Sequence, residues 1–147
     1  EPFINDVTLF PLRINRHLEG SFTEIFHHSD FYAIAQLSAS VINPGVINAF
    51  HIHPKRSQAE IWYVMKGEML VCLIDLRRQS PTYDTIQRIY LSAEAPCLLY
   101  IPDGVAHGYK TGVNGATLLY ATSSSFDGTN EGRISWDAFG EEIWKRS

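Results

Sequence analysis

The sequence has little cysteine, no long hydrophobic run and no excess of basic charge. Only Cys72 and Cys97 occur among 147 residues, both in apolar stretches, which predicts free thiols rather than a disulfide. No apolar run approaches the roughly 20 residues of a membrane-spanning helix, and no signal-peptide pattern opens the chain. A net charge of −4 gives no reason to expect nucleic acid. We therefore expect a cytoplasmic protein with neither a nucleic-acid nor a membrane partner.

Helical periodicity is also scarce. From 43 to 123, short segments rich in β-branched and aromatic residues alternate with turn residues, which is typical of β-strands. The expected strands are 46–53, 61–64, 68–76, 87–91, 97–101, 106–110 and 117–122. Lys66-Gly67 and Asn114-Gly115 predict hairpin turns. This spacing indicates one all-β domain over 1–147, a sandwich or small barrel, with a short helix or docked irregular segment at 137–145.

Histidine and glutamate gather in two short segments. His51 and His53 are two residues apart in a predicted strand, so both imidazoles project from one face. Glu60 lies near the start of the next strand, and His107 follows a tight turn. Three imidazoles and one carboxylate suit Zn, Fe, Mn, Ni or Cu, without choosing among them. These four residues are the predicted ligands of a divalent metal ion; the alternative is a polar lining of a solvent-filled barrel mouth.

The order of these residues resembles the two cupin motifs. The first motif is Gly, five residues, His-x-His, a variable gap, Glu, six residues and Gly; the second is Pro-x-Gly-x-x-His. Here they are Gly45, His51, His53, Glu60 and Gly67, then Pro102, Gly104 and His107. The gap before Glu60 is longer than the commonest form. The resemblance implies a cupin fold, which is a double-stranded β-helix (jelly-roll) barrel.

A broader similarity runs from about residue 18 to residue 144. Over this span the chain is similar to the dTDP-4-dehydrorhamnose 3,5-epimerases, which are themselves cupins. The matching stretches include GSFTE at 20–24, QLSAS at 36–40, DLRRQSPTY at 75–83, IPDGVAHGY at 101–109 and EGRISWD at 131–137. Within DLRRQSPTY, Arg77-Arg78 is interpreted as a solvated turn in which Arg77 can contribute a structural ion pair.

This resemblance implies an isomerase of carbohydrate metabolism. In the family, a histidine removes a proton from the carbon next to the 4-keto group of a sugar, and a tyrosine on the opposite face acts as the acid. The matching residues are His51 as catalytic base and Tyr120 as catalytic acid, and His107 matches a second active-site histidine. The residues implied at the substrate pocket are Phe22, Glu24, Gln36 and Asn48.

Three positions depart from the family. One arginine of the family is Glu19 here, a second is Asn48, and a lysine is Glu60. A carboxylate in place of a cation turns attraction for a diphosphate into repulsion. The printed sequence also ends before the position of the aspartate that pairs with the base. Because Glu60 and His53 are ligand types standing where the family has none, we expect a divalent ion to replace the missing stabilisation of an enolate.

Three classes of function stay open. The first is an epimerase or isomerase acting on a keto-sugar, free or nucleotide-linked, with metal assistance. The second is a metal-dependent cupin oxidoreductase such as a dioxygenase, or a lyase, and the third is a non-catalytic cupin that binds a sugar. The resemblance also implies a homodimer in which residues 1–17 form an arm at the interface, and in which Phe22 and Glu24 reach the pocket of the partner.

Overall fold

The chain folds almost entirely into β-strands. The structure, a computed structural model, describes residues 2–26 and 34–145. The strands are β1 (Thr8–Pro11), β2 (Ile14–His17), β3 (Gly20–Thr23), β4 (Gln36–Ile42), β5 (Ile47–Ile52), β6 (Glu60–Asp75), β7 (Ile86–Ser92), β8 (Cys97–Ile101), β9 (Val105–Thr122) and β10 (Gly132–Arg133). Two single-turn 3₁₀ helices flank β10, η1 (Gly128–Asn130) before it and η2 (Glu141–Trp144) after it. The predicted all-β class is confirmed, and neither described helix has the length and apolarity to cross a bilayer.

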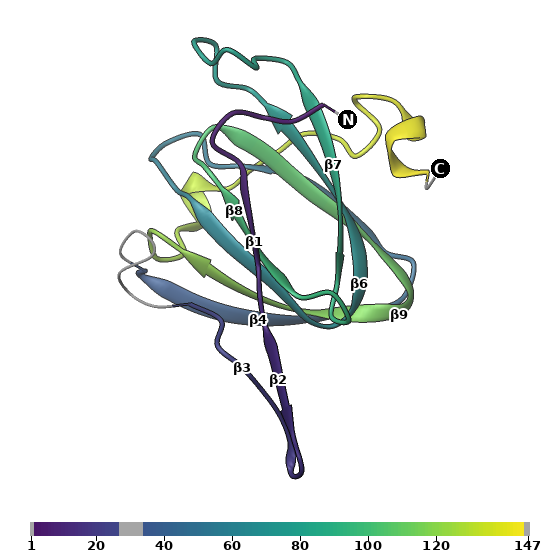
Figure 1. Cartoon of the computed structure of the whole chain (residues 1–147). Coiled ribbons are helices and arrows are strands. Elements are labelled where there is room, and N and C mark those ends of the chain that lie inside the picture. The colour runs from purple at the N-terminus through teal and green to yellow at the C-terminus, as the bar shows by residue number, and fades with distance from the viewer. Residues whose placement is uncertain (1, 27–33, 146–147) are drawn as a thin grey trace.

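The two long strands β6 and β9 organise the barrel. They pair with each other along nearly their whole length. The first half of β6 also pairs with β8, which pairs with β1, and the second half of β9 pairs with β4. The second half of β6 pairs with β7. The first half of β9 pairs with β5, which in turn pairs with β10. The two sets of strands enclose a common interior, which gives the expected jelly-roll barrel (Figure 1).

Both long strands bend at the glycines that predicted hairpins. Gly67 and Gly115 have φ angles of +79° and +67°, a left-handed conformation that favours glycine. A Cβ atom on Gly67 would lie 2.1 Å from the carbonyl oxygen of Gly115, so the two bends touch. The hairpin predictions at Lys66-Gly67 and Asn114-Gly115 are wrong, because the flanking segments continue as one strand through a change of register. These glycines form bulges and bends instead of two-residue loops.

The bulges change which residues of the long strands face the interior. In β6, even-numbered positions such as Trp62 belong to the main core before the bulge, and odd-numbered positions such as Met69 belong to it afterwards. In β9 the change runs from odd to even numbers. A one-residue insertion has this effect because side chains alternate between the two faces of a strand. The same alternation turns Glu60 and His107 inward.

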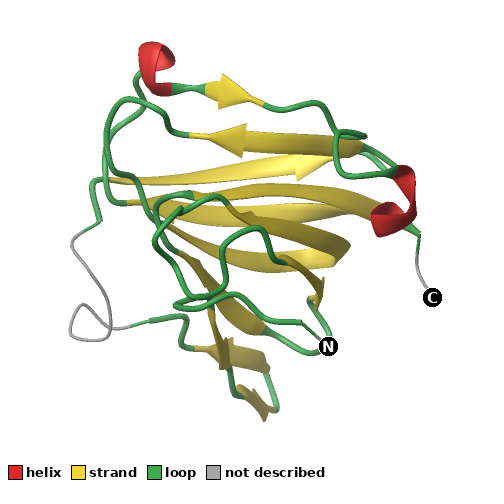
Figure 2. Ribbon diagram, turned by 90° about the horizontal axis from the view of Figure 1, so that it is seen from above, coloured by secondary structure: helices red, strands yellow, loops and turns green. Residues whose placement is uncertain are grey.

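The C-terminal segment covers a second apolar cluster. Trp144 in η2 is buried and packs in one cluster with Phe50 and Cys72, so the predicted docked tail is confirmed. Figure 2 shows both 3₁₀ helices at the margins of the strands, outside the barrel. Both cysteines are free thiols as predicted, Cys72 fully buried and Cys97 half-buried.

The N-terminal segment has two parts. Ile4 is buried in the main core and β1 pairs with β8, so the first part of the predicted arm 1–17 lies on the barrel of its own chain. The β2–β3 hairpin then forms a separate two-stranded sheet that projects from the barrel (Figure 1). Leu18 at its turn is fully exposed. The hairpin is therefore the portion of this segment that is available to another molecule.

Candidate active site and metal centre

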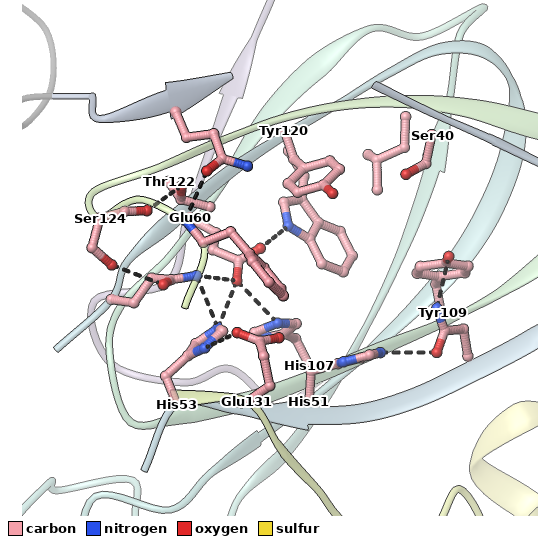
Figure 3. A pocket seen from close by; sticks show the side chains of 16 residues that line it. Ser40, His51, His53, Glu60, His107, Tyr109, Tyr120, Thr122, Ser124 and Glu131 are labelled. Carbon is pink, nitrogen blue, oxygen red and sulfur yellow. Dashed lines mark hydrogen bonds and ion pairs between the residues drawn. The ribbon is translucent and has the colours of Figure 1, made fainter. Parts of the chain in front are cut away.

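A cavity of about 200 Å³ lies between the two halves of the barrel (Figure 3). Its lining is polar and aromatic and comes from β4, β5, β6, β9 and the loops at their ends. The residues are Gln36, Ser40, Asn48, His51, His53, Gln58, Glu60, Trp62, His107, Tyr109, Leu118, Tyr120, Thr122, Ser124, Phe126 and Glu131. Most of the residues predicted for a site are therefore neighbours in space, although they are spread over a large part of the sequence.

Two imidazoles and one carboxylate converge at one point of this cavity. Glu60 Oε2 lies 2.8 Å from His53 Nε2 and 3.2 Å from His107 Nε2. One ligand atom from each of the three residues lies within 4.8 Å of the others. All three side chains are almost completely buried, being 6–7% exposed. The structure brings together three of the four predicted metal ligands, and His51 is outside this group.

Hydrogen bonds fix which nitrogen of each imidazole faces Glu60. His107 Nδ1 lies 3.3 Å from the carbonyl oxygen of Val105, and His53 Nδ1 lies 3.4 Å from the carbonyl oxygen of Asn130 and 3.3 Å from Glu131 Oε2. A carbonyl or carboxylate oxygen accepts, so each Nδ1 carries a proton. Nε2 then donates to Glu60 when the ring is charged, and presents a lone pair when the ring is neutral. Outer partners of this kind orient metal-binding histidines. The donor set therefore fits a divalent cation.

Glu60 is held in its charged form. Burial raises the pKa of this carboxyl, but the charge of His107 and hydrogen bonds from His107, His53 and Trp62 outweigh burial, so its pKa lies well below the usual range. The Trp62 Nε1–H group donates to Glu60 Oε1 at 2.9 Å. Burial lowers the pKa of His53, but the hydrogen bond and charge of Glu60 leave it raised. A proton on His53 and a divalent ion are alternative ways to satisfy the same carboxylate.

His51 has a different environment. Its Nε2 lies 2.8 Å from Asn48 Oδ1, and Asn48 Nδ2 donates to the Tyr109 hydroxyl at 3.1 Å. The amide oxygen accepts, so Nε2 carries the proton and Nδ1 the lone pair. The ring stacks on that of His107 at a centroid distance of 5.9 Å. Burial, followed by the charges of His107 and Arg133, lowers the pKa of His51 to about 4. The imidazole is neutral near pH 7, as a general base requires.

A register irregularity explains why Asn48 can hold His51. The pairing of β5 with β9 shifts between these two residues. In a regular strand, residues three apart point to opposite faces, whereas a bulge allows both to face the same side. Both residues line the cavity, so Asn48 is a positioning residue for the imidazole.

The other predicted site residues divide into two groups. Tyr120 and Gln36 line the cavity (Figure 3). Tyr120 belongs to the half of β9 that pairs with β4, whereas His51 in β5 pairs with the other half of β9. Phe22 and Glu24 do not line it. They line a second hollow beside the projecting hairpin. The structure thus brings Gln36, Asn48 and Tyr120 to the imidazoles and leaves Phe22 and Glu24 outside.

Sequence reasoning did not find the supporting residues Gln58, Asn130 and Glu131. Asn130 is buried, and its Oδ1 accepts from the backbone N–H groups of residues 55 and 56 at 2.7 and 2.9 Å, which fixes the loop that follows His53. Gln58 Nε2 lies 3.2 Å from His53 Nε2. The only sequence signal was that Glu131 opens the matched stretch EGRISWD. Local pattern cannot show that this stretch returns to the loop after β5.

A jelly-roll barrel whose interior cavity is lined by histidines and a glutamate defines a protein of the cupin class. A family model described as dTDP-4-dehydrorhamnose 3,5-epimerase matches residues 2–144. The chain therefore belongs to this family, whose members are epimerases, and the family and cupin resemblance inferred from the sequence is confirmed.

Individual relatives support this assignment. The spore coat polysaccharide biosynthesis protein SpsL of Bacillus subtilis is 43% identical over 105 residues, which cover 69% of this chain and 68% of SpsL. The dTDP-4-dehydrorhamnose 3,5-epimerase of Salmonella typhimurium is 27% identical over 142 residues, covering 91% of this chain and 78% of that enzyme.

Solved structures show the same fold. The dTDP-4-dehydrorhamnose 3,5-epimerase of Elizabethkingia anophelis has a TM-score of 0.87 at 22% identity, covering 100% of this chain and 85% of that one. ChmJ, a 3'-monoepimerase of Streptomyces bikiniensis in complex with dTDP-quinovose, has a TM-score of 0.85 at 22% identity, covering 91% and 72%. At this identity the likeness establishes the fold alone.

Proposed function

We propose that the protein is an epimerase or isomerase that removes a proton from the carbon next to the carbonyl of a keto-sugar. His51 is the proposed base and Tyr120 the proposed acid. The observation that carries this proposal is a half-buried imidazole, held by Asn48, in a cavity whose opposite half supplies a tyrosine. A base placed in this way contributes about 10²- to 10⁴-fold to a proton transfer.

The proposed reaction has two steps. The C–H bond next to the carbonyl breaks, the proton passes to His51 Nδ1, and the electron pair moves to the carbonyl oxygen as an enolate. The Tyr120 hydroxyl then gives a proton to the opposite face of the same carbon, and the carbonyl forms again. Because the proton leaves from one face of the carbon and a proton returns to the other, the configuration at that carbon is inverted. Proton exchange with water restores both side chains.

We propose that a divalent ion held by His53, Glu60 and His107 assists this proton transfer. The support is chemical: two imidazole lone pairs and one carboxylate face one point, and the remaining N–H group of each imidazole is bonded to an oxygen. When bound, such an ion supplies a Lewis acid that stabilises negative charge on an oxygen of the substrate. His51 remains a free base because Asn48, rather than the ligand group, holds its ring.

A pair of histidine variants tests the assignment. We expect His51→Ala to lose solvent deuterium incorporation at the carbon next to the carbonyl while keeping bound metal, as measured by NMR and ICP-MS. We expect His53→Ala, two residues further along the chain and just after β5, to lose the metal. Loss of metal from both variants would instead support the four-ligand site. Unchanged exchange in His51→Ala would contradict the catalytic assignment.

The tyrosine assignment has its own control. Tyr120→Phe removes only a hydroxyl, so we expect inversion to fall by about 10²-fold or more without unfolding. Tyr83 is exposed and lies outside the cavity, so Tyr83→Phe should leave inversion unchanged. Equal activity in both variants would remove Tyr120 from the mechanism.

A second candidate function rests on the ligand set itself. Two histidines and one carboxylate are also the ligands of non-haem iron in oxygenases. Oxygen consumption by iron-loaded protein with a sugar or carbonyl compound, stopped by His53→Ala, would favour a metal-dependent oxidoreductase. Deuterium incorporation without oxygen consumption favours the isomerase.

We also propose a homodimer in which the β2–β3 hairpin reaches the partner. Leu18 and Phe22 expose 101% and 58% of their surface. Phe22 lines a hollow in which apolar side chains are mixed with the polar groups of Arg13, Asn15 and Glu24. Burial of Leu18 and Phe22 against a second copy would remove apolar surface from water. Light scattering at micromolar concentration tests this, and a monomer would contradict it. The free thiols agree with a reducing compartment, such as the cytoplasm.

A further inference from the structure

The charges of the cavity point to a substrate that carries no phosphate. Among the described residues that line it there is no lysine and no arginine, whereas Glu60 and Glu131 place two carboxylates in its wall. Phosphate sites in proteins are built from arginine, lysine, helix N-termini or a metal ion. The only described helices are single 3₁₀ turns. Granted the proposed function, we infer that the substrate is an uncharged, monosaccharide-sized carbonyl compound rather than a nucleotide diphosphate sugar.

The cations near the cavity lie outside its lining, although the charge of Arg133 reaches His51. Arg56 is engaged outside the cavity, with Asp127 at 3.8 Å and the carbonyl oxygen of Ser125 at 3.1 Å. Arg133 stands opposite His51 in the pairing of β10 with β5, but its side chain is not part of the lining. Outside the described residues, the sequence contains only Arg146 as a permanent cation.

A partner's hairpin would not supply the missing charge either. The segment from β1 to the end of the hairpin, residues 8–26, contains two arginines and two glutamates, Arg13, Arg16, Glu19 and Glu24. These charges cancel, so an arm reaching into a neighbouring cavity brings no net positive charge.

A bound divalent ion would leave the cavity neutral. Its two positive charges would be balanced by the carboxylates of Glu60 and Glu131, and the imidazoles that bind it are uncharged. No surplus positive charge then remains for a diphosphate. Glu131 has a particular role in this balance, because its carboxylate is 35% exposed and lies beyond His53 from the proposed ion.

The size and lining of the cavity agree with a single sugar ring. Its volume of about 200 Å³ is below the roughly 300–1,000 Å³ of sites that enclose a drug-sized ligand. The Ser40 hydroxyl can donate and accept, as sugar hydroxyls require. The Thr122 hydroxyl, which donates to the Ser124 carbonyl oxygen, can still accept. The Gln36 amide, which donates to Ser38 and accepts from the Phe126 N–H group, keeps a second N–H group. Trp62 and Phe126 add aromatic surface for the apolar face of a ring.

A matched pair of substrates tests the inference. The methyl glycoside and the dTDP derivative of 6-deoxy-4-ketoglucose share the reacting ring. Only the dTDP derivative carries the diphosphate and the nucleoside. We expect solvent deuterium incorporation into the methyl glycoside with the higher kcat/KM, and no inhibition of this exchange by 1 mM dTDP or pyrophosphate, taking about 1 mM as a weak-binding limit. A higher kcat/KM for the dTDP-linked form would overturn the inference while leaving the proposed function intact.

Direct binding measurements distinguish a failure of the proposed proton transfer from a failure of the inference about substrate charge. If neither sugar exchanges, the proposed proton transfer fails for this ring, and calorimetry then decides the question of charge. Tighter binding of the methyl glycoside than of dTDP supports the inference, whereas tighter binding of dTDP, or no binding of either compound, overturns it.

Removal of one carboxylate provides a further test. At a saturating concentration of metal ion, Glu131→Gln should strengthen binding of dTDP by about fivefold, the effect of one nearby charge in water-exposed surroundings. The control Glu142→Gln changes an exposed carboxylate in η2, outside the cavity, and should leave dTDP binding as it was. An equal response of the two variants would contradict a repulsive role for Glu131.

Discussion

Strand β6 begins at one buried carboxylate, Glu60, and ends at another, Asp75, and the two have different surroundings. Asp75 accepts from the Arg77 Nε–H group at 2.9 Å and from the hydroxyls of Ser80 and Thr82 at 2.6 and 2.7 Å. Its donors all come from the seven residues that follow it. Glu60 faces the Nε2 atom of His53, seven residues before it, and that of His107, which lies on β9, far along the chain.

The difference separates a structural carboxylate from one available for chemistry. The guanidinium of Arg77 is permanently charged, so Asp75 has a full set of partners and no need for a further cation. An imidazole is charged only when protonated, and its Nε2 lone pair can serve a metal instead. Burial alone therefore does not identify a site: both carboxylates are buried, and the protonation freedom of their partners distinguishes them.

The largest effect is expected at Glu60. Glu60→Gln removes the only carboxylate in the group of three ligands, so bound metal should be lost and deuterium exchange should fall by roughly a thousandfold, the upper range for loss of electrostatic stabilisation. Metal content by ICP-MS and exchange by NMR measure both. Retained metal in a folded Glu60→Gln protein would show that Glu60 is not a ligand.

Asp75→Asn should affect stability instead. Asn keeps the shape but leaves Arg77 without its buried partner, which costs about 3 kcal/mol in the free energy of unfolding. Urea unfolding at pH 7 measures this, and metal content should stay at the wild-type level. A metal-depleted but stable Asp75→Asn protein would reverse the contrast between the two ends of β6.

The pH dependence of stability should separate Asp75 further. Burial raises the pKa of Asp75, but hydrogen bonds from Arg77, Ser80 and Thr82 outweigh it, so its folded pKa lies below the unfolded value of about 3.9. Its contribution is therefore complete above about pH 4 and is lost as pH falls towards the folded pKa. The stability gap between wild type and Asp75→Asn, from urea unfolding, should narrow between pH 4 and pH 2. A constant gap would contradict the depressed pKa.

The contrast between local and distant partners also explains what the sequence could predict. The partners of Asp75 lie within DLRRQSPTY, and the ion pair expected of Arg77 was visible there. His51 and His53 could be placed on one strand face by spacing alone. His53, and not His51, joins Glu60 and His107, and His51 is instead bonded to Asn48, which the register shift in β5 brings to the same face. No local pattern encodes such a shift.

The fold was predicted in class but not in strand order. Turn residues at Lys66-Gly67 and Asn114-Gly115 favour hairpins by propensity, yet the long pairing of β6 with β9 converts them into bends. Tertiary pairing outweighs a local turn preference when both flanking segments bury apolar side chains on the same partner. The metal-binding and catalytic roles of the site residues stay predictions, because geometry brings side chains together without showing what they bind.

The smallest effect is expected at Glu131, which connects the Glu60 centre to a loop more than 70 residues away. Its carboxylate lies 3.3 Å from His53 Nδ1 and supports the tautomer in which Nε2 is free to bind a metal. Loss of such an outer partner typically lowers metal affinity by 10- to 100-fold.

The Asn130 carbonyl also accepts from His53 Nδ1, so the effect of Glu131→Gln should lie at the lower end of that range. We expect Zn²⁺ binding to weaken by about tenfold in a competition assay with a chromogenic chelator. Asp75 also has distant support, because Asp6 Oδ2 accepts from Arg77 Nη1 at 3.0 Å, but none of its partners is an imidazole. Thr82→Val beside Asp75 should leave Zn²⁺ affinity unchanged while lowering stability. Unaltered Zn²⁺ affinity in Glu131→Gln would mean that the Asn130 carbonyl alone orients His53.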